Sequence, residues 1–181
     1  MRKVTAGLFS SIDGVVQAPN EWQPAFDDEM GTALSRTLEE QDAVLLGRVT
    51  FEEWAGYWPT STDEPFAGWI NRTPKYIAST TLDAVDHWAN STLIAGSVTD
   101  FIADLKRQDG GTIGTAGSPT LVRSLIEHGL VDELMLMISP VVAGGSRTRL
   151  FLDNAPLTKF ELVAAQPTSS GTVIATYRPI P

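Results

Sequence analysis

The sequence predicts an α/β fold, in which a mostly parallel β-sheet with an antiparallel C-terminal edge carries helices on its faces. Strand-like and helix-like segments alternate from residue 3 to residue 128, which is typical of parallel sheets. Residues 43–46 are wholly apolar, as expected for a central strand buried on both faces. After residue 132 the pattern contains strands alone and ends in a hairpin. With 181 residues and no linker or internal repeat, we expect residues 1–181 to form a single domain.

Apolar periodicity and chain breakers predict five segments in the first half of the chain. The predicted helix has acidic residues in its first turn and places Met30, Leu34 and Leu38 on one face. Gly47 ends the central strand, and the loop-like stretch is rich in Pro, Gly, Thr and Trp. In chain order the segments are a strand, a helix, the central strand, a short helix and a loop: residues 3–9, 27–40, 43–46, 50–55 and 56–73.

The second half predicts two more strand–helix pairs and then strands. Thr99 is the expected N-cap of a helix that has Phe101, Ile102 and Leu105 on one side. Residues 167–171 form the expected turn of the terminal hairpin. In chain order the segments are two strands, a helix, a strand, a helix, a long strand and the hairpin strands: residues 75–79, 93–95, 99–107, 111–115, 118–128, 132–142, 160–165 and 172–177.

A glycine-bearing turn stands out between a strand and a helix, at residues 114–121 with the sequence Gly-Thr-Ala-Gly-Ser-Pro-Thr-Leu. Ser118 is a natural N-cap, Pro119 fits the first helical position, and Gly129 supplies the stop. Such a turn presents free backbone N–H groups and the positive end of the helix dipole, so it predicts a phosphate site. The alternative is an ordinary strand–turn–helix junction.

Composition narrows the classes of function. The net charge of −9 argues against nonspecific binding to nucleic acid or to anionic membranes, and no stretch is long and apolar enough to span a bilayer. The N-terminus reads as a first strand instead of a signal peptide, so we expect a cytoplasmic protein. Without cysteine, disulfides and thiolate chemistry are excluded. His87 and His128 are too few for a histidine-rich centre, and we expect no metal site.

Three groups of residues resemble the dihydrofolate reductase superfamily, most closely the branch related to the C-terminal reductase domain of bifunctional riboflavin-biosynthesis proteins. The matching segments span nearly the whole chain: 11–14, 45–52, and 114–118 with 129–134, 140–142 and 150–151. The resemblance implies a dihydrofolate reductase-like three-layer fold with an eight-stranded, mostly parallel sheet, an antiparallel C-terminal edge and flanking helices. It also implies NADPH bound at the carboxyl ends of the strands, where ligands sit in open α/β sheets.

The predicted cofactor site lies at two places where a strand leads into a helix. Gly47 lets backbone approach a phosphate, and Arg48 offers a planar fork for the 2′-phosphate. Residues 115–117 supply one of the two adjacent glycines that are commoner in the family. The predicted cofactor-binding residues are Gly47, Arg48, Thr50, Ser79, Thr80, Gly114, Thr115, Ala116, Gly117, Ser118 and Leu121.

The substrate side is predicted from carboxylates and aromatic rings. Hydride transfer leaves charge on the substrate, which needs a proton source or polarising group. By resemblance, Asp28 is the expected pocket carboxylate, with Asp27 close behind; Asp13 is a second catalytic candidate. The alternatives are acids that complement a helix N-terminus and an Asp-Gly turn.

Flat aromatic walls suit a flat heterocycle, so tryptophans are the expected substrate contacts. These are Trp22, Trp54 and Trp58, although Trp54 is about as readily explained as core. A residue for a substrate phosphate is less obvious from the sequence: the candidates are Arg72, Lys75, Arg147 and Arg149, the last two of which would also suit a subunit contact.

Two functions stay open. The first is an NADPH-dependent reductase of a small heterocycle, resembling a pterin or an aminouracil ribosyl phosphate. The second is an NADPH-binding homologue with a sensor or accessory role. A Ser-His-Asp hydrolase is disfavoured, because the chain has no Gly-x-Ser-x-Gly elbow. The apolar run Leu134–Ile138 and the resemblance together predict a homodimer packed through the late strands.

Overall fold

The computed structural model describes residues 1–180 and, of Ala116, the backbone alone. One sheet of eight strands spans this part of the chain. The strands are β1 (Val4–Ser11), β2 (Gln41–Gly47), β3 (Lys75–Ala78), β4 (Ser91–Leu93), β5 (Thr112–Ala116), β6 (Glu133–Ser139), β7 (Phe160–Pro167) and β8 (Val173–Pro179). The helices are α1 (Pro19–Trp22), α2 (Asp28–Glu40), α3 (Arg48–Ala55), α4 (Phe66–Arg72), α5 (Val98–Arg107) and α6 (Pro119–Glu127), with a 3₁₀ turn η1 (Trp58–Thr60).

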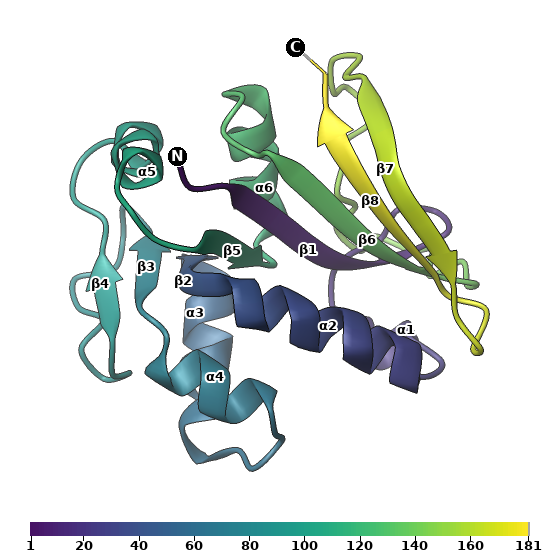
Figure 1. Ribbon diagram of the computed structural model, residues 1–181, viewed down its shortest axis with the longest axis horizontal. Coiled ribbons are helices and arrows are strands. Elements are labelled where there is room, and N and C mark those ends of the chain that lie inside the picture. The colour runs from purple at the N-terminus through teal and green to yellow at the C-terminus, as the bar shows by residue number, and fades with distance from the viewer. Residues whose placement is uncertain (181) are drawn as a thin grey trace.

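The strand order is β4-β3-β2-β5-β1-β6-β8-β7 (Figure 1). The first six of these strands run parallel to one another, and crossovers connect them. Strand β8 runs antiparallel to β6, and β7 runs antiparallel to β8, which makes the terminal hairpin the edge of the sheet. This confirms the predicted mixed sheet with an antiparallel C-terminal edge.

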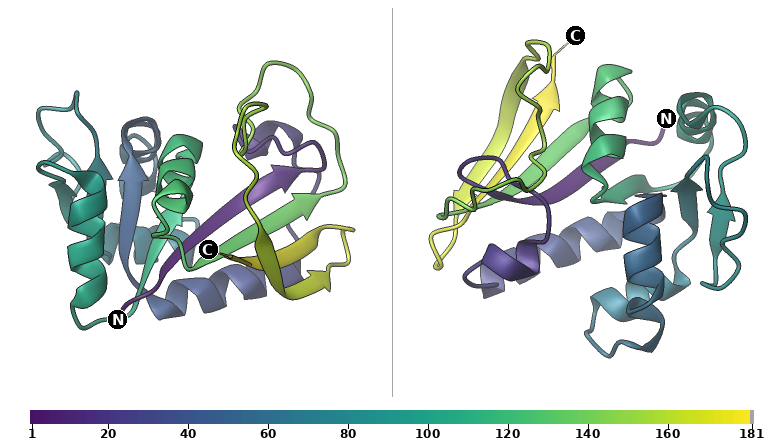
Figure 2. Two further views of the ribbon diagram at one scale, coloured as in Figure 1. Left: turned by 90° about the horizontal axis from the view of Figure 1, so that it is seen from above. Right: turned by 180° about the vertical axis from the view of Figure 1, so that it is seen from behind.

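Strand β2 shows why the sheet has helices on both faces. Its alternate residues enter different cores. Ala43 and Leu45 pack with α5 and α6 in the first core, whereas Val44 and Leu46 pack with α2, α3 and α4 in the second core. All four side chains are buried, as predicted for a central strand. In Figure 1, α2 crosses the near side of the sheet and α6 the far side, and the two further views in Figure 2 show the same layers from above and from behind.

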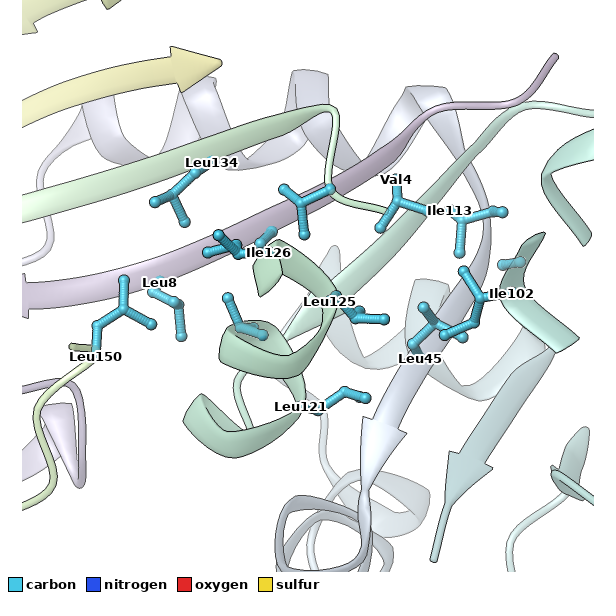
Figure 3. Close-up of a cluster of buried hydrophobic side chains, with 14 of the residues drawn as sticks. Val4, Leu8, Leu45, Ile102, Ile113, Leu121, Leu125, Ile126, Leu134 and Leu150 are labelled. Carbon is cyan, nitrogen blue, oxygen red and sulfur yellow. The ribbon is translucent and has the colours of Figure 1, made fainter. Parts of the chain in front are cut away.

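Helix α6 supplies much of the first core. Leu121, Leu125 and Ile126 point from one helix face onto the sheet, toward residues such as Leu8 and Leu45 (Figure 3). The helix ends in a Schellman motif at Gly129, which has φ +65°. There the Gly129 amide donates to the Ile126 carbonyl, and the Leu130 amide donates to the Leu125 carbonyl. The predicted glycine stop is therefore confirmed.

Several predicted elements need correction. Residues 56–73 are not a loop: they contain η1 and α4, whose Trp69 and Ile70 are buried in the second core. A seven-residue helix offers too little periodicity to be recognised in a stretch rich in Pro and Gly. Strand β4 begins two residues earlier than predicted, at Ser91. The long strand predicted from Asp132 to Val142 ends at Ser139.

Two predicted N-caps are also wrong. Helix α5 is capped by Ser97, whose Oγ accepts a hydrogen bond from the Asp100 amide (3.2 Å), instead of by Thr99. Ser118 precedes α6 but has left-handed φ/ψ of 55° and 78°, and its side chain makes no capping hydrogen bond. Pro119 does occupy the first turn of α6, as predicted. Of the helices in residues 1–180, not one combines the length and apolar character needed to cross a membrane.

Candidate active site

Two strand-to-helix junctions lie side by side at the carboxyl ends of two neighbouring central strands. Strand β2 leads directly into α3, and its neighbour β5 leads into α6 through Gly117 and Ser118. The two junctions touch: a Cβ on Gly47 would overlap the Ser118 hydroxyl and lie 2.7 Å from the Ser118 Cβ. A Cβ on Gly117, which has φ +91°, would lie 3.6 Å from Thr50 Oγ1. Only glycine at position 47 permits this approach.

The N-termini of α3 and α6 differ from those of the other long helices. Helix α2 is capped by the Asp27 carboxylate and α5 by the Ser97 hydroxyl. In contrast, neither α3 nor α6 has a side-chain cap. Apart from Pro119, whose nitrogen carries no hydrogen, the backbone N–H groups of their first turns and the positive ends of their dipoles therefore remain available at the carboxyl ends of the neighbouring strands β2 and β5. This pair of helix ends is suited to an anion with more than one phosphate.

The other predicted phosphate contacts are arranged around these junctions. Arg48 lies in the first turn of α3 and pairs with Glu52 at 2.7 Å, with both side chains about half exposed. Ser79 follows β3, and its Oγ accepts hydrogen bonds from the Thr81 and Leu82 amides (3.1 Å each), which shapes the turn there. Thr80 is exposed in that turn. An anion would have to draw Arg48 away from Glu52.

Three predicted cofactor residues have internal roles instead. Gly114 and Thr115 lie within β5, not in a turn. A Cβ on Gly114 would overlap the Gln41 side-chain amide, which donates to Thr5 Oγ1 (3.1 Å). Thr115 is buried, and its hydroxyl donates to the Gly117 carbonyl (3.3 Å). Leu121 is a core residue, and the side chain of Ala116 lies outside the described part of the chain.

Asp13 is held by donors from two segments. Its carboxylate accepts hydrogen bonds from Ser11 Oγ (2.6 Å) and from the Ala143 and Gly144 amides (3.0 Å each), and it pairs with Arg149 at 3.2 Å. The Ser11 hydrogen bond, aided by those amides and opposed by burial, lowers the pKa of Asp13 to about 2. The carboxyl group is therefore ionised at neutral pH, so it has no proton to donate.

Asp27 is similarly occupied. One of its oxygens accepts from the Met30 amide (2.9 Å) as the α2 cap, and the other accepts from the Ser170 amide (3.0 Å). Burial raises the pKa of Asp27, but hydrogen bonds from Ser170, Thr168 and Met30 outweigh burial and hold the pKa well below its usual range. Asp27 thus joins α2 to the β7–β8 turn. This structural role accounts for an aspartate at position 27 without any ligand.

Asp28 differs from both of these aspartates. It is exposed in the first turn of α2, and it borders a shallow hollow of about 240 Å³ with Thr32, Arg36 and Gln166. A larger open groove of about 1040 Å³ lies at the opposite end of the strands, beside Lys3, Glu133 and Arg178. Within residues 1–180, no group of three His, Asp or Glu side chains is placed to hold a metal ion.

The predicted aromatic walls are mostly packed among themselves. Trp54 and Trp58 contact each other with ring centroids 6.0 Å apart, and both contact Phe66, so they belong to the second core. Trp22 lies on α1 and donates its indole N–H to the Gln17 carbonyl (2.8 Å). Two exposed apolar residues belong to the matching motifs but were not among the predicted contacts: Val49 lies in the first turn of α3, at one junction, and Ile12 follows the carboxyl end of β1.

Three of the four candidate cations for a substrate phosphate have partners within the protein, whereas Arg72 is exposed at the end of α4. Lys75 is fully buried, where its Nζ donates to the Ile70 and Thr73 carbonyls (2.9 and 3.0 Å). Burial lowers its pKa to about 8. Arg147 pairs with Glu21 at 3.2 Å, and Arg149 pairs with Asp13. Lys75 can therefore be set aside as a ligand residue, whereas both arginines connect loops at the carboxyl ends of β1 and β6.

Comparisons with known proteins identify the family of this chain. Residues 2–174 match the model of the RibD C-terminal domain. The uncharacterized protein YyaP of Bacillus subtilis is 29% identical over 183 residues, which cover 97% of this chain and 94% of YyaP. A solved structure from Shewanella sp. PV-4 that carries a riboflavin-biosynthesis name has a TM-score of 0.78 at 19% identity, with 99% of each chain covered.

A second solved structure extends the likeness to dihydrofolate reductases. Dihydrofolate reductase from Enterococcus faecalis, complexed with NADP(H), has a TM-score of 0.66 at 16% identity, covering 99% of this chain and 97% of that one. At this level of identity the likeness concerns the fold. The chain belongs to the RibD C-terminal domain family, and its fold is that of the dihydrofolate reductase superfamily.

Proposed function

We propose that this protein is an NADPH-dependent reductase of a small nitrogen heterocycle. The observation that carries the proposal is the contact between the β2–α3 and β5–α6 junctions, where Gly47 meets Ser118 and two long helices begin without side-chain caps. A pyrophosphate fits such a paired arrangement of helix ends. Arg48 beside it would distinguish the 2′-phosphate of NADPH from the hydroxyl of NADH.

The cofactor would supply a hydride, and the chain would supply its placement and a polar environment. In this proposal, Gly47, Gly117 and Ser118 form the cradle, with Thr50 and Arg48 at its rim. The apolar side chains of Ile12 and Val49, which are 63% and 52% exposed, would contact the flat rings of cofactor and substrate.

We propose a substrate of the pterin or aminouracil ribosyl phosphate type. Support comes from the family, whose structural neighbours include a 5-amino-6-(5-phosphoribosylamino)uracil reductase from Thermotoga maritima, and this chain spans 57% of that longer bifunctional protein. Since Asp13 and Asp27 are ionised and occupied, Asp28 is the proposed polarising carboxylate. Asp28→Asn should lower kcat while leaving NADPH affinity unchanged, and steady-state kinetics would check this. An unchanged kcat would remove Asp28 from the mechanism.

An accessory protein that binds NADPH without efficient turnover is the second candidate. The hydrogen bonds that hold Asp13 and Asp27 ionised favour it, because two of the three aspartates predicted for the substrate side cannot deliver a proton at neutral pH. This candidate shares the cofactor site with the first one and differs in turnover alone.

Two measurements test the proposal. The five tryptophans report binding when NADPH or NADH is titrated against protein fluorescence. Oxidation of NADPH is then followed with a panel of pterin, pyrimidine and deazaflavin-like substrates. Binding with turnover supports the reductase, and binding without turnover on the whole panel supports the accessory protein. No binding of either nucleotide would overturn both candidates.

A further inference from the structure

Two loops distant in sequence form one structure at the carboxyl ends of β1 and β6. The segment 12–17 follows β1, and the segment 141–150 follows β6. Backbone hydrogen bonds connect them along their length: Ile12 N to Val141 O (2.8 Å), Val16 N to Thr148 O (3.0 Å) and Leu150 N to Gly14 O (3.0 Å). An antiparallel bridge pairs Val15 with Arg149. We refer to segments 12–17 and 141–150 together as the double loop.

Side chains make the double loop part of the folded core at one end. Val15, Val16 and Leu150 are all less than 8% exposed, and Leu150 and Val16 belong to the first core. The other end is polar, where Arg147 pairs with Glu21 of α1 and the Thr148 amide donates to Gln17 Oε1 (2.9 Å). The double loop is therefore anchored at its base, and polar contacts determine how its exposed part lies.

Asp13 is the centre of these polar contacts. Its two carboxylate oxygens accept from the Ala143 and Gly144 amides, and its backbone carbonyl accepts from Arg149 Nε at 3.0 Å. Arg149 Nη2 completes an ion pair with the same carboxylate. Gly144 has φ +58°, a conformation that few other residues adopt, so this part of the loop has little intrinsic preference for its observed shape. Asp13 and Arg149 together determine it.

The position of the double loop links it to the proposed cofactor cradle. Strand β1 lies between β5 and β6 in the sheet, and Gly7 of β1 pairs with Ala116 just before the β5–α6 turn. Ile12 follows the carboxyl end of β1 and Val142 that of β6, so these exposed residues of the double loop lie toward the same ends of the parallel strands as Gly117 and Ser118. Loops at this edge border the ligand in open α/β sheets.

We infer that Asp13 is a positioning residue, which holds the 141–150 segment in place at the carboxyl ends of β1 and β6 through the Ala143 and Gly144 amides and Arg149. This inference rests on the proposed function as far as the neighbouring ligand is concerned. It replaces the predicted role of Asp13 as an acid, because all the groups that face its carboxylate are hydrogen-bond donors or a cation: Ser11, Ala143, Gly144 and Arg149. The low pKa of Asp13 agrees with this role.

The test compares Asp13→Asn with the wild type and with Asp86→Asn, a matched change at an exposed aspartate outside the double loop. Hydrogen exchange of the Ala143 and Gly144 amides should accelerate about 10- to 100-fold in Asp13→Asn, since a charged acceptor is lost. With a substrate that the wild type reduces, the kcat/KM of Asp13→Asn should fall by the same factor at every pH. The apparent pKa values of the rising and falling limbs of the pH profile should therefore stay as in the wild type. The NADPH affinity should stay within about three-fold, because the pyrophosphate contacts are elsewhere.

Arg149→Ala provides a second variant in case Asp13→Asn does not fold, and it should accelerate the same two amides. Unchanged exchange at both amides in either folded variant would overturn the inference. So would loss of one limb of the pH profile in Asp13→Asn, since that would make Asp13 an acid or base itself. If the wild type neither binds NADPH nor reduces the panel, the proposed function fails, and the exchange measurement still decides whether Asp13 holds the loop.

Discussion

Two glycines with similar sequence surroundings, Gly47 and Gly114, contact different partners in the fold. Gly47 and Gly114 both lie at or near a predicted strand end, and both read as phosphate-turn glycines. In the structure Gly47 contacts Ser118 of the neighbouring junction, whereas Gly114 makes room inside the sheet for the Gln41 amide. The difference depends on which strand lies alongside, since β2 and β5 are about seventy residues apart in sequence. The role of each glycine therefore depends on its neighbours in the tertiary structure.

The Gly47–Ser118 contact predicts a compensating pair of substitutions. Gly47→Ala should destabilise the fold by about 1–3 kcal/mol and abolish NADPH binding, because the new Cβ overlaps the Ser118 side chain. Ser118→Gly alone should be neutral or stabilising by about 1 kcal/mol, since Ser118 has φ 55°. The double variant should recover the stability of the single Ser118→Gly protein. Urea unfolding of all four proteins measures this cycle, and strictly additive effects would contradict the contact.

Arg48 predicts cofactor preference. Arg48→Ala should lower NADPH affinity about 10- to 100-fold, because a charge-assisted hydrogen bond contributes about 1.5–3 kcal/mol, while NADH affinity should hardly change. Arg107→Ala is the matched control, since Arg107 also forms a local helical ion pair, with Asp104. Fluorescence titration measures both affinities. Equal losses for NADPH and NADH would remove Arg48 from the 2′-phosphate site.

At the scale of elements, the start of α2 is fixed to the turn between β7 and β8. Asp27 caps the helix and accepts from the Ser170 amide, and the Ser169 hydroxyl donates to Glu29 at 3.0 Å. The helix N-terminus is therefore tied to the β7–β8 turn, which lies some 140 residues later in the chain. The acidic cluster that suggested a pocket is explained in large part by this contact.

This contact predicts a pH-dependent loss of stability. The pKa of Asp27 is lower in the folded protein than its ordinary value of 3.8, so its ionised form stabilises the fold above that pH. Asp27→Ala should therefore lower the melting temperature at pH 7, and the difference from wild type should shrink as the pH falls below about 4. Glu39→Ala, an exposed change at the other end of α2, is the control. A difference that stays constant from pH 7 to pH 3 would contradict the assigned contacts.

At the scale of the whole molecule, the predicted homodimer needs a different surface from the one the apolar run suggested. Leu134 and Met137 are 1% and 3% exposed, and Met135 packs against Gly7, so the run in β6 is used within one chain. Exposed apolar side chains gather instead on the edge strand β7 and the segment before it: Phe151, Leu152, Leu162 and Val163. We propose that the homodimer forms through the late strands and buries this surface.

Sedimentation tests this proposal. The wild type should sediment at twice the chain mass of 19.6 kDa, and Leu162→Asp should sediment as a monomer with unchanged secondary structure. Tyr57→Asp is a control of similar exposure on the β2–β3 half of the molecule. Met137→Asp should instead unfold the protein, because that side chain is in a core. A wild-type species at the single-chain mass would refute the dimer.

Local periodicity determined the elements that bury a full face. The central strand at 43–46, helix α2 with Met30 and Leu38, and the Gly129 stop follow from side-chain size and backbone preference, which act over a few residues. Helix α4 and the Ser97 cap were missed. A helix this short depends on Trp69 and Ile70 reaching a core that other elements complete, and either of two nearby hydroxyls satisfies the rule for a cap.

The sequence by itself determined the fold class, the place of the two strand-to-helix junctions and the family motifs, because these depend on short-range pattern. The tertiary structure alone decided which candidate residues remain available. The carboxylate of Asp13 is engaged by an amide 130 positions away, and that of Asp27 by an amide 143 positions away. A buried or charged group takes the partner that best offsets its desolvation, and that partner becomes known only when distant segments meet.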